Sequence, residues 1–250
     1  MCFILLLRRM HPDYPLIVAA NRDERRDRPS SGPQQWEGRP VIWAGRDEVA
    51  GGTWLGVNEH GMVAAITNRQ GGVADPKLPS RGTLCLDTLR QQSPASARTY
   101  VSEAVGRAAY NPFNLVCTDR REGWVMTSGG SVHHLAAGPH VVTNHGDADD
   151  PSLPEVQRAL ADLTAGSVWT LRLEEILAML AQICRDTREP NPICRAGGDR
   201  GTVSSSMIAV RVDGSLAAYW HAEGPPCDPA HEYRPLDFRE TAPRSQKTIG

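Results

Sequence analysis

The residue with the clearest chemical potential is the second one. Cys2 follows the initiator methionine, which is normally removed when the next residue is small. The mature chain would then carry a thiol and a free α-amine on one residue, with ordinary pKa values of about 8.5 and about 7.7–8.0. These values are close enough for the amine to serve as the thiol's general base, which is the chemistry of an N-terminal nucleophile. The alternative is a buried cysteine that packs at the start of a strand.

A hairpin is expected to bring polar groups to Cys2. Apolar runs over residues 2–8 and 15–21 flank a turn-forming segment, which predicts two paired strands. In this hairpin Cys2 falls opposite Asn21, within one residue, and Asp23 lies on the same face.

The polar cluster that contains these residues ends the second strand. In it, Asp23 could hold the amine, while Asn21 and Arg22 are candidate substrate-binding residues. Arg22 could lower the pKa of the thiol or bind an anionic group. The other interpretation of such a charge run is a solvated strand exit.

Two asparagines are candidates for oxyanion stabilisation. Asn68 and Asn144 each end an apolar strand in a Thr-Asn dipeptide. Side-chain amides at strand ends can donate to the oxyanion that develops during amide hydrolysis. Asparagines that simply begin turns are common, so each alone is a weak signal.

Trp54 and Arg81 complete the candidate substrate-binding set. Trp54 lies in a short glycine-flanked stretch, where it fills a core or forms the wall of a pocket. Arg81 stands at the start of an expected helix, where it could meet a carboxylate, a phosphate or only a neighbouring side chain. Eight histidines and six methionines are conceivable haem ligands. Ordinary surface or core histidines are the favoured interpretation, and no metal site is expected.

Hairpins and helices alternate along the rest of the chain. Further hairpins are predicted at 53–58/62–68, 113–118/123–128 and 203–212/215–221, and helices at 80–91, 93–108, 155–165 and 171–185. Residues 22–40 are expected to form a long loop. The pattern predicts an α+β layered protein with one domain over residues 1–223 and a polar, proline-rich tail over 224–250.

Composition excludes several classes of protein. With 250 residues, 40% of them hydrophobic, and a net charge of −2, neither global disorder nor a dedicated nucleic-acid binder is expected. The N-terminal apolar run is too short for stable membrane insertion, and Arg8 and Arg9 follow it rather than precede it, unlike a signal peptide. No glycine-rich nucleotide-binding motif follows a strand.

The cysteines suggest a compartment. The six cysteines include no CxxC pair, which indicates a reducing, cytoplasmic environment in which all except Cys2 are ordinary reduced thiols.

An ordered set of motifs carries a family resemblance. The set comprises Met-Cys at the start, Ala-Ala-Asn-Arg-Asp-Glu at 19–24, Gly-Gly-Thr-Trp-Leu-Gly at 51–56, Ala-Ala-Ile-Thr-Asn at 64–68, Ser-Arg-Gly at 80–82 and Tyr-Asn-Pro-Phe-Asn at 110–114. Together they resemble the transport-and-Golgi-organisation family, also called the NRDE-motif family. The resemblance covers residues 1–145 and is looser beyond them.

That family is similar to N-terminal-nucleophile hydrolases, particularly the choloylglycine-hydrolase and acyltransferase branch. The resemblance implies a four-layer αββα sandwich with antiparallel sheets, in which Cys2 is the nucleophile and Asp23 the acid beside it. Asn68 and Asn144 then resemble the oxyanion- and amine-binding asparagines. Ala20 stands where those hydrolases have an arginine. Arg22 is the candidate substitute, although a one-residue offset in a strand would turn it to the other face.

Two functions follow as expectations. The first is a Cys2-dependent hydrolase or acyltransferase that acts on an amide or thioester of a small molecule and requires no cofactor. The second is a non-enzymatic carrier or trafficking chaperone of haem or another hydrophobic metabolite, such as a lipid or acyl compound, in the same cleft. Family members are associated with secretory organisation, lipid metabolism and haem mobilisation.

Overall fold

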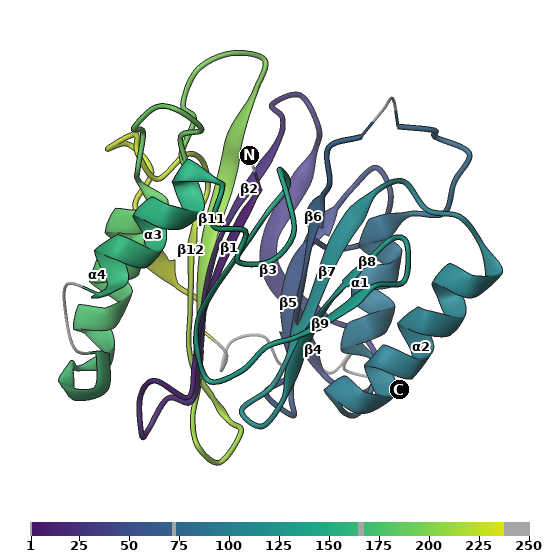
Figure 1. The fold of residues 1–250 in the computed structure, drawn as a ribbon, viewed down its shortest axis with the longest axis horizontal. Helices are drawn as coiled ribbons and strands as arrows, with labels where there is room; N and C mark the ends of the chain where they lie inside the picture. The colour runs from purple at the N-terminus through teal and green to yellow at the C-terminus, as the bar shows by residue number, and fades with distance from the viewer. Residues whose placement is uncertain (1, 72–73, 165–167, 238–250) are drawn as a thin grey trace, which may run out of the picture.

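The chain folds into four layers, in the order helices, sheet, sheet, helices (Figure 1). The computed structural model describes residues 2–71, 74–164 and 168–237. Sheet A has the strand order β10 (Gly138–Thr143), β1 (Phe3–Arg8), β2 (Leu16–Arg25), β11 (Arg200–Val210), β12 (Leu216–Ala222) and β13 (Arg234–Pro235). Sheet B has the order β3 (Ser30–Trp36), β4 (Ile42–Asp47), β5 (Leu55–Asn58), β6 (Val63–Asn68), β7 (Phe113–Thr118), β8 (Gly123–Thr127) and β9 (Val132–His134).

Each sheet carries helices on its outer face. Helices α3 (Pro154–Thr164) and α4 (Leu173–Cys184), with the short 3-10 helix η1 (Val168–Thr170), lie on sheet A, and α1 (Arg81–Leu89) and α2 (Pro94–Arg107) lie on sheet B (Figure 1). The strands pair antiparallel throughout the described residues. The expected four-layer αββα sandwich with antiparallel sheets is therefore confirmed.

The continuous apolar runs reflect burial on both faces of a strand. In β1, Phe3 and Leu5 pack toward α3 and α4, whereas Ile4 and Leu6 pack between the two sheets. Successive side chains of a strand point to opposite faces, so a strand covered on both sides needs no polar alternation. Sheet B repeats the pattern, and the chain thereby builds three apolar layers.

Local signals for the helix starts are confirmed. The Ser80 hydroxyl accepts from the Thr83 amide at the start of α1. At the start of α2, Ser93 and Ser96 form a reciprocal capping box, with Pro94 as the first helical residue. These caps satisfy backbone donors that have no partner inside a helix. The hairpins expected at β5/β6, β7/β8 and β11/β12 also form.

The long loop expected over residues 22–40 is wrong. Strand β2 continues to Arg25, and β3 occupies Ser30–Trp36 at the edge of sheet B. This edge strand contains Pro33 and is only partly buried. It has neither the apolar alternation nor the residue types of a central strand, so its sequence resembles a loop.

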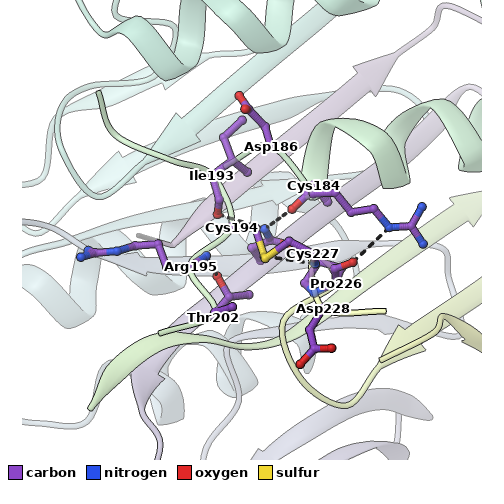
Figure 2. Close-up of a disulfide and its surroundings, with 12 residues drawn as sticks. Cys184, Asp186, Ile193, Cys194, Arg195, Thr202, Pro226, Cys227 and Asp228 are labelled. Carbon is purple, nitrogen blue, oxygen red and sulfur yellow. Dashed lines mark hydrogen bonds between the residues drawn. A yellow bond between two sulfur atoms is a disulfide. The ribbon is translucent and has the colours of Figure 1, made fainter. Parts of the chain in front are cut away.

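The expectation that the five cysteines other than Cys2 are ordinary reduced thiols is wrong for two of them, whereas Cys85, Cys117 and Cys184 are free. Cys194 and Cys227 form a disulfide that joins the segment after α4 to the segment after β12 (Figure 2). Disulfides are typical of oxidising compartments, so the cysteine pattern no longer supports a reducing one. The cytoplasmic location stays a prediction. Of the two cysteines, Cys227 lies in the region expected to be a tail, whose described part also contains β13, paired with β12.

Within the described ranges, no helix combines the length and the apolar character needed to cross a membrane.

A close backbone contact joins α1 to the start of β5. A Cβ atom on Gly52 would lie 2.1 Å from the Gly82 carbonyl carbon, and the Thr53 amide donates to the Gly82 carbonyl at 3.0 Å. Only glycine fits at position 52, because the neighbouring atoms belong to the backbone.

We expect Gly52→Ala to lower the free energy of unfolding by about 1–3 kcal/mol through overpacking, measured by urea denaturation. The matched control is Gly106→Ala in α2, where no atom lies within 4 Å of the added Cβ. That change should be neutral or stabilising by up to ~1 kcal/mol. Equal stability of the two variants would contradict the interpretation of this contact.

Candidate functional site

Cys2 lies where two hollows meet at one end of sheet A. The larger hollow has a volume of about 500 Å³ and the smaller about 230 Å³. Five residues line both: Cys2, Asp23, Glu24, Asn68 and Arg200. We call the two hollows together the cleft. The half-buried Cys2 thiol donates to the backbone carbonyl of Asp23, with 3.5 Å between sulfur and oxygen.

The register of β1 and β2 decides which side chains face the cleft. Phe3 pairs with Asn21, so the next position outward sets Cys2 opposite Arg22. Cys2 and Arg22 therefore share a face, together with Ala20, which is two residues from Arg22. Arg22 was expected to face the other side of the strand from Ala20, the position at which the resembling hydrolases have an arginine. That expectation is wrong, because Arg22 and Ala20 point to the same side.

Asn21 faces away from the cleft. Its side-chain amide donates to the carbonyls of Cys184, at 2.8 Å, and Ile193, at 3.1 Å. It is 2% exposed and lines neither hollow. The structure therefore places this expected substrate-binding residue against the end of α4, where it holds the backbone.

Asp23 reaches the cleft at a strand irregularity. The pairing of β2 with β11 shifts between Thr202 and Ser204, so one extra residue bulges from β11 opposite Asp23. Such bulges bend a strand and re-aim its side chains. The Thr202 hydroxyl donates to Asp23 Oδ1 at 2.7 Å, which anchors the carboxylate where the two hollows meet.

Asn68 and Asn144 come together from different sheets. Asn68 ends β6 of sheet B, whereas Asn144 directly follows β10 of sheet A, and both line the smaller hollow. The Gln70 amide donates to the Asn144 carbonyl at 2.9 Å and ties the two segments together. Asn144 Oδ1 is buried and has no hydrogen-bond partner among the described residues. A ligand donor in the smaller hollow would satisfy it.

Arg22 and Trp54 form one wall of the larger hollow. The Arg22 guanidinium lies 4.1 Å from the centroid of the Trp54 ring, a cation–π contact. Arg22 also donates to the Ser30 hydroxyl at 2.9 Å and lies 3.7 Å from an Asp47 carboxylate oxygen. Asp47 and Ser30 belong to strands that the sequence did not reveal, so these partners could not be anticipated.

Arg81 also lines the larger hollow. Its guanidinium donates to the Pro112 carbonyl at 2.9 Å and makes no ion pair with a described carboxylate. It can therefore bind a ligand anion without first breaking a salt bridge. Of the eight expected site residues, the structure brings together all except Asn21.

The surroundings of the Cys2 sulfur pull its pKa in two directions. Burial raises the pKa of the thiol above its ordinary value, and the nearby Glu24 carboxylate raises it further. The Arg22 charge and a hydrogen bond to the Asn68 backbone lower that pKa. Cys85 and Cys117 are buried in the core, where the pKa of each is raised without any such compensation.

Some residues of the site gave no sequence signal. Thr202 directly precedes a predicted strand, and Arg195 and Arg200 belong to a polar, glycine-containing segment that resembles an ordinary loop. Among the described residues, no cluster of three or more histidine, cysteine or acidic side chains could hold a metal ion.

The comparisons with known proteins agree on a family and a fold. The family model described as "Transport and Golgi organisation 2" matches residues 1–219. The mouse protein "Transport and Golgi organization 2 homolog" is 35% identical over 123 residues, which is 48% of this chain and 42% of that protein. The human homologue is 36% identical over 110 residues, 42% of this chain and 39% of its own length. The matched region thus spans about two fifths of these relatives.

Solved structures with this fold include proteins described as an acylase, a bile acid hydrolase and an acid amidase. The penicillin V acylase of Agrobacterium tumefaciens has a TM-score of 0.64 and 14% identity, covering 96% of this chain and 87% of that one. A mutant conjugated bile acid hydrolase of Clostridium perfringens gives 0.61 and 13%, covering 96% and 93%. The N-acylethanolamine-hydrolysing acid amidase orthologue of Caenorhabditis elegans gives 0.56 and 12%, covering 85% and 93%. At these identities the likeness establishes the fold alone.

The opposing charges at Cys2 predict opposite effects of two substitutions. Arg22→Gln should raise the pKa of the thiol and slow its alkylation by iodoacetamide at pH 8 about three- to tenfold, because less thiolate is present. Glu24→Gln should lower that pKa and accelerate the same reaction. Rates are measured by mass spectrometry of the Cys2 peptide.

Arg25→Gln is the matched control, because Arg25 lines the same hollow but is largely exposed and paired with Asp27. Changes of the same sign in the Arg22 and Glu24 variants would indicate altered access to Cys2 and would contradict the electrostatic account.

Proposed function

Because this chain belongs to the Transport and Golgi organisation 2 family and has the N-terminal-nucleophile-hydrolase fold, we propose that it is a hydrolase or acyltransferase that uses Cys2. The observation that carries the proposal is the position of the Cys2 sulfur. It lies where the two hollows meet, with Asp23 and Asn68 at the same point.

The proposed reaction begins with removal of Met1. The α-amine of Cys2 takes the proton of its own thiol as sulfur attacks the carbonyl carbon of an amide or thioester. Because burial raises the pKa of the thiol, proton transfer accompanies the attack, and no preformed thiolate is required. Asp23 orients the resulting ammonium group.

The tetrahedral intermediate carries a negative oxygen. The Asn68 backbone already donates toward the sulfur, and the side-chain amides of Asn68 and Asn144 are the further donors in reach of this point. As the intermediate collapses, the leaving amine or thiol takes the proton from the ammonium group, and the acyl group stays on sulfur as a thioester. Water, or another acceptor nucleophile, then gives a proton to the amine and attacks the thioester carbonyl carbon. The C–S bond breaks, the acyl group leaves as a carboxylic acid or on the acceptor, and the sulfur takes the proton back from the ammonium group, which regenerates the thiol.

The two hollows suggest which part of the substrate goes where. Trp54, Ile66 and Leu78 contribute apolar surface to the larger hollow, which suits an acyl group. Gln70, Asn144 and Arg195 line the smaller hollow, which suits a polar leaving group. Arg81 would bind an anionic group of the same small-molecule substrate.

The carrier function remains a separate prediction. Among the described residues that line the cleft there is no histidine, methionine or tyrosine, so Cys2 would be the axial ligand of a bound haem. No contact of the described residues favours this function over acyl transfer.

Acylation of Cys2 tests the proposal. Intact mass should show loss of Met1, and incubation with p-nitrophenyl esters or N-acyl amides should add one acyl group to Cys2. Cys2→Ala should abolish the adduct, whereas Cys85→Ala, a change in the buried core, should retain it. Asn144→Ala should slow acylation about 10²-fold if its amide donates to the oxyanion.

Retention of Met1, or an equal adduct in Cys2→Ala, would contradict the mechanism. Saturable haem binding that shifts the absorbance spectrum and is lost in Cys2→Ala would favour the carrier instead.

A further inference from the structure

We propose that Thr202 is a positioning residue for Asp23, and that the Cys194–Cys227 disulfide fixes the segment that orients Thr202. The inference rests on the proposed role of Asp23 at Cys2. It assigns a part in the site to a threonine and a disulfide that neither touch Cys2 nor line the larger hollow.

The hydroxyl of Thr202 has its hydrogen bonds fixed on both sides. Thr202 is fully buried, and its Oγ1 accepts from the Arg195 amide at 3.0 Å. The same Oγ1 donates to Asp23 Oδ1 at 2.7 Å. A hydroxyl has a single proton, so the amide donor on one side directs that proton to the carboxylate on the other. Hydrogen bonds to a charged acceptor are the stronger kind, and this one holds the carboxylate in place.

The backbone of Arg195 is itself fixed by Thr202. The Thr202 amide donates to the Arg195 carbonyl at 2.9 Å, which gives a reciprocal pair of contacts between the two residues. The bulge that follows Thr202 sets its side chain against Asp23. The orientation of the carboxylate therefore depends on where the segment around Arg195 lies.

The disulfide anchors that segment at its neighbouring residue (Figure 2). Cys194 is bonded to Cys227, and its amide donates to the Asp186 carbonyl at 2.8 Å. On the partner side, Arg185 at the end of α4 donates to the Pro226 carbonyl at 3.0 Å. Both ends of the disulfide are thus fixed near the end of α4.

A second anchor comes from β2 itself. Asn21 donates to the carbonyls of Cys184 and Ile193, which places the segment on the strand that carries Asp23 two residues later. The buried Asn21 therefore acts on the site indirectly, by holding the segment around Ile193 in place, although its side chain faces away from the cleft. From the disulfide, the connection runs through the Arg195 amide and the Thr202 hydroxyl to Asp23.

The test compares four variants by the pH profile of Cys2 alkylation, which requires no substrate. Asp23→Asn defines the effect of losing the carboxylate. Thr202→Val removes the hydroxyl at nearly constant volume and should shift the profile in the same direction, with rates at pH 8 changed about three- to tenfold. Thr202→Ser keeps the hydroxyl and should restore the wild-type profile. Thr88→Val is the control, since the Thr88 hydroxyl is buried in α1 and donates only to Leu84.

A wild-type profile in Thr202→Val, or in Asp23→Asn, would overturn the proposal. Should Thr202→Val not fold, as judged by circular dichroism, Thr202→Ala is the substitute and is read in the same way. Absence of a Cys2 acyl adduct in the wild-type protein would instead count against the proposed function, and the alkylation comparison would still decide the role of Thr202.

Removal of the disulfide tests the second half of the inference. Cys194→Ala with Cys227→Ala should shift the alkylation profile in the direction of Thr202→Val. Adding Thr202→Val to that pair should give no further shift, because both changes act through one hydrogen bond and their effects are not additive. An unshifted profile would show that the disulfide acts on stability alone, and full additivity would show that it acts on Cys2 by a route other than the Thr202 hydrogen bond. Either result would overturn its proposed role.

Discussion

The pairing of β1 with β2 is the constraint on which the molecule depends. Each strand is buried on both faces, so its odd and even residues feed two different apolar layers. A slip of one residue would exchange those layers completely, which burial strongly disfavours. The same register, continued one step past Phe3, turns Cys2 and Arg22 into the cleft and Asn21 against α4. Packing of the core and the geometry of the site are therefore set by one choice of register.

The charges on β2 explain why a built-in base suits this site. Arg22 and Glu24 lie two residues apart and act on the Cys2 sulfur with opposite signs, so the field of the cleft does not by itself create a thiolate. Burial adds to the preference for the neutral thiol. In the proposed mechanism the α-amine of Cys2 is the general base, which resolves this, because the proton leaves the thiol only as sulfur attacks.

The sequence reveals the local features of this chain better than its long-range contacts. The serine caps of α1 and α2 and the hairpin turns are encoded within a few residues, and each could be predicted. Likewise, the position of Cys2 next to the initiator methionine and the Thr-Asn dipeptides that end at Asn68 and Asn144 pointed to residues that line the cleft. By contrast, the turn between β1 and β2 limits their register only to within one residue, so it could not decide whether Asn21 faces the cleft. Thr202 meets Asp23 across 179 positions of sequence, and Cys194 meets Cys227 without any motif.

The strand order has a further consequence at the four sheet edges. Long, regular edges invite a second chain to add a strand, and natural sheets avoid this with short, interrupted or covered edges. Here β13 has two residues and β9 has three, while β3 contains Pro33 and an irregular register. At the remaining edge, the Val141 amide and carbonyl of β10 are both hydrogen-bonded to Asp149 of the following loop. Two broad sheets can thus lie face to face in one chain without offering, in its described part, a regular template for self-association through their edges.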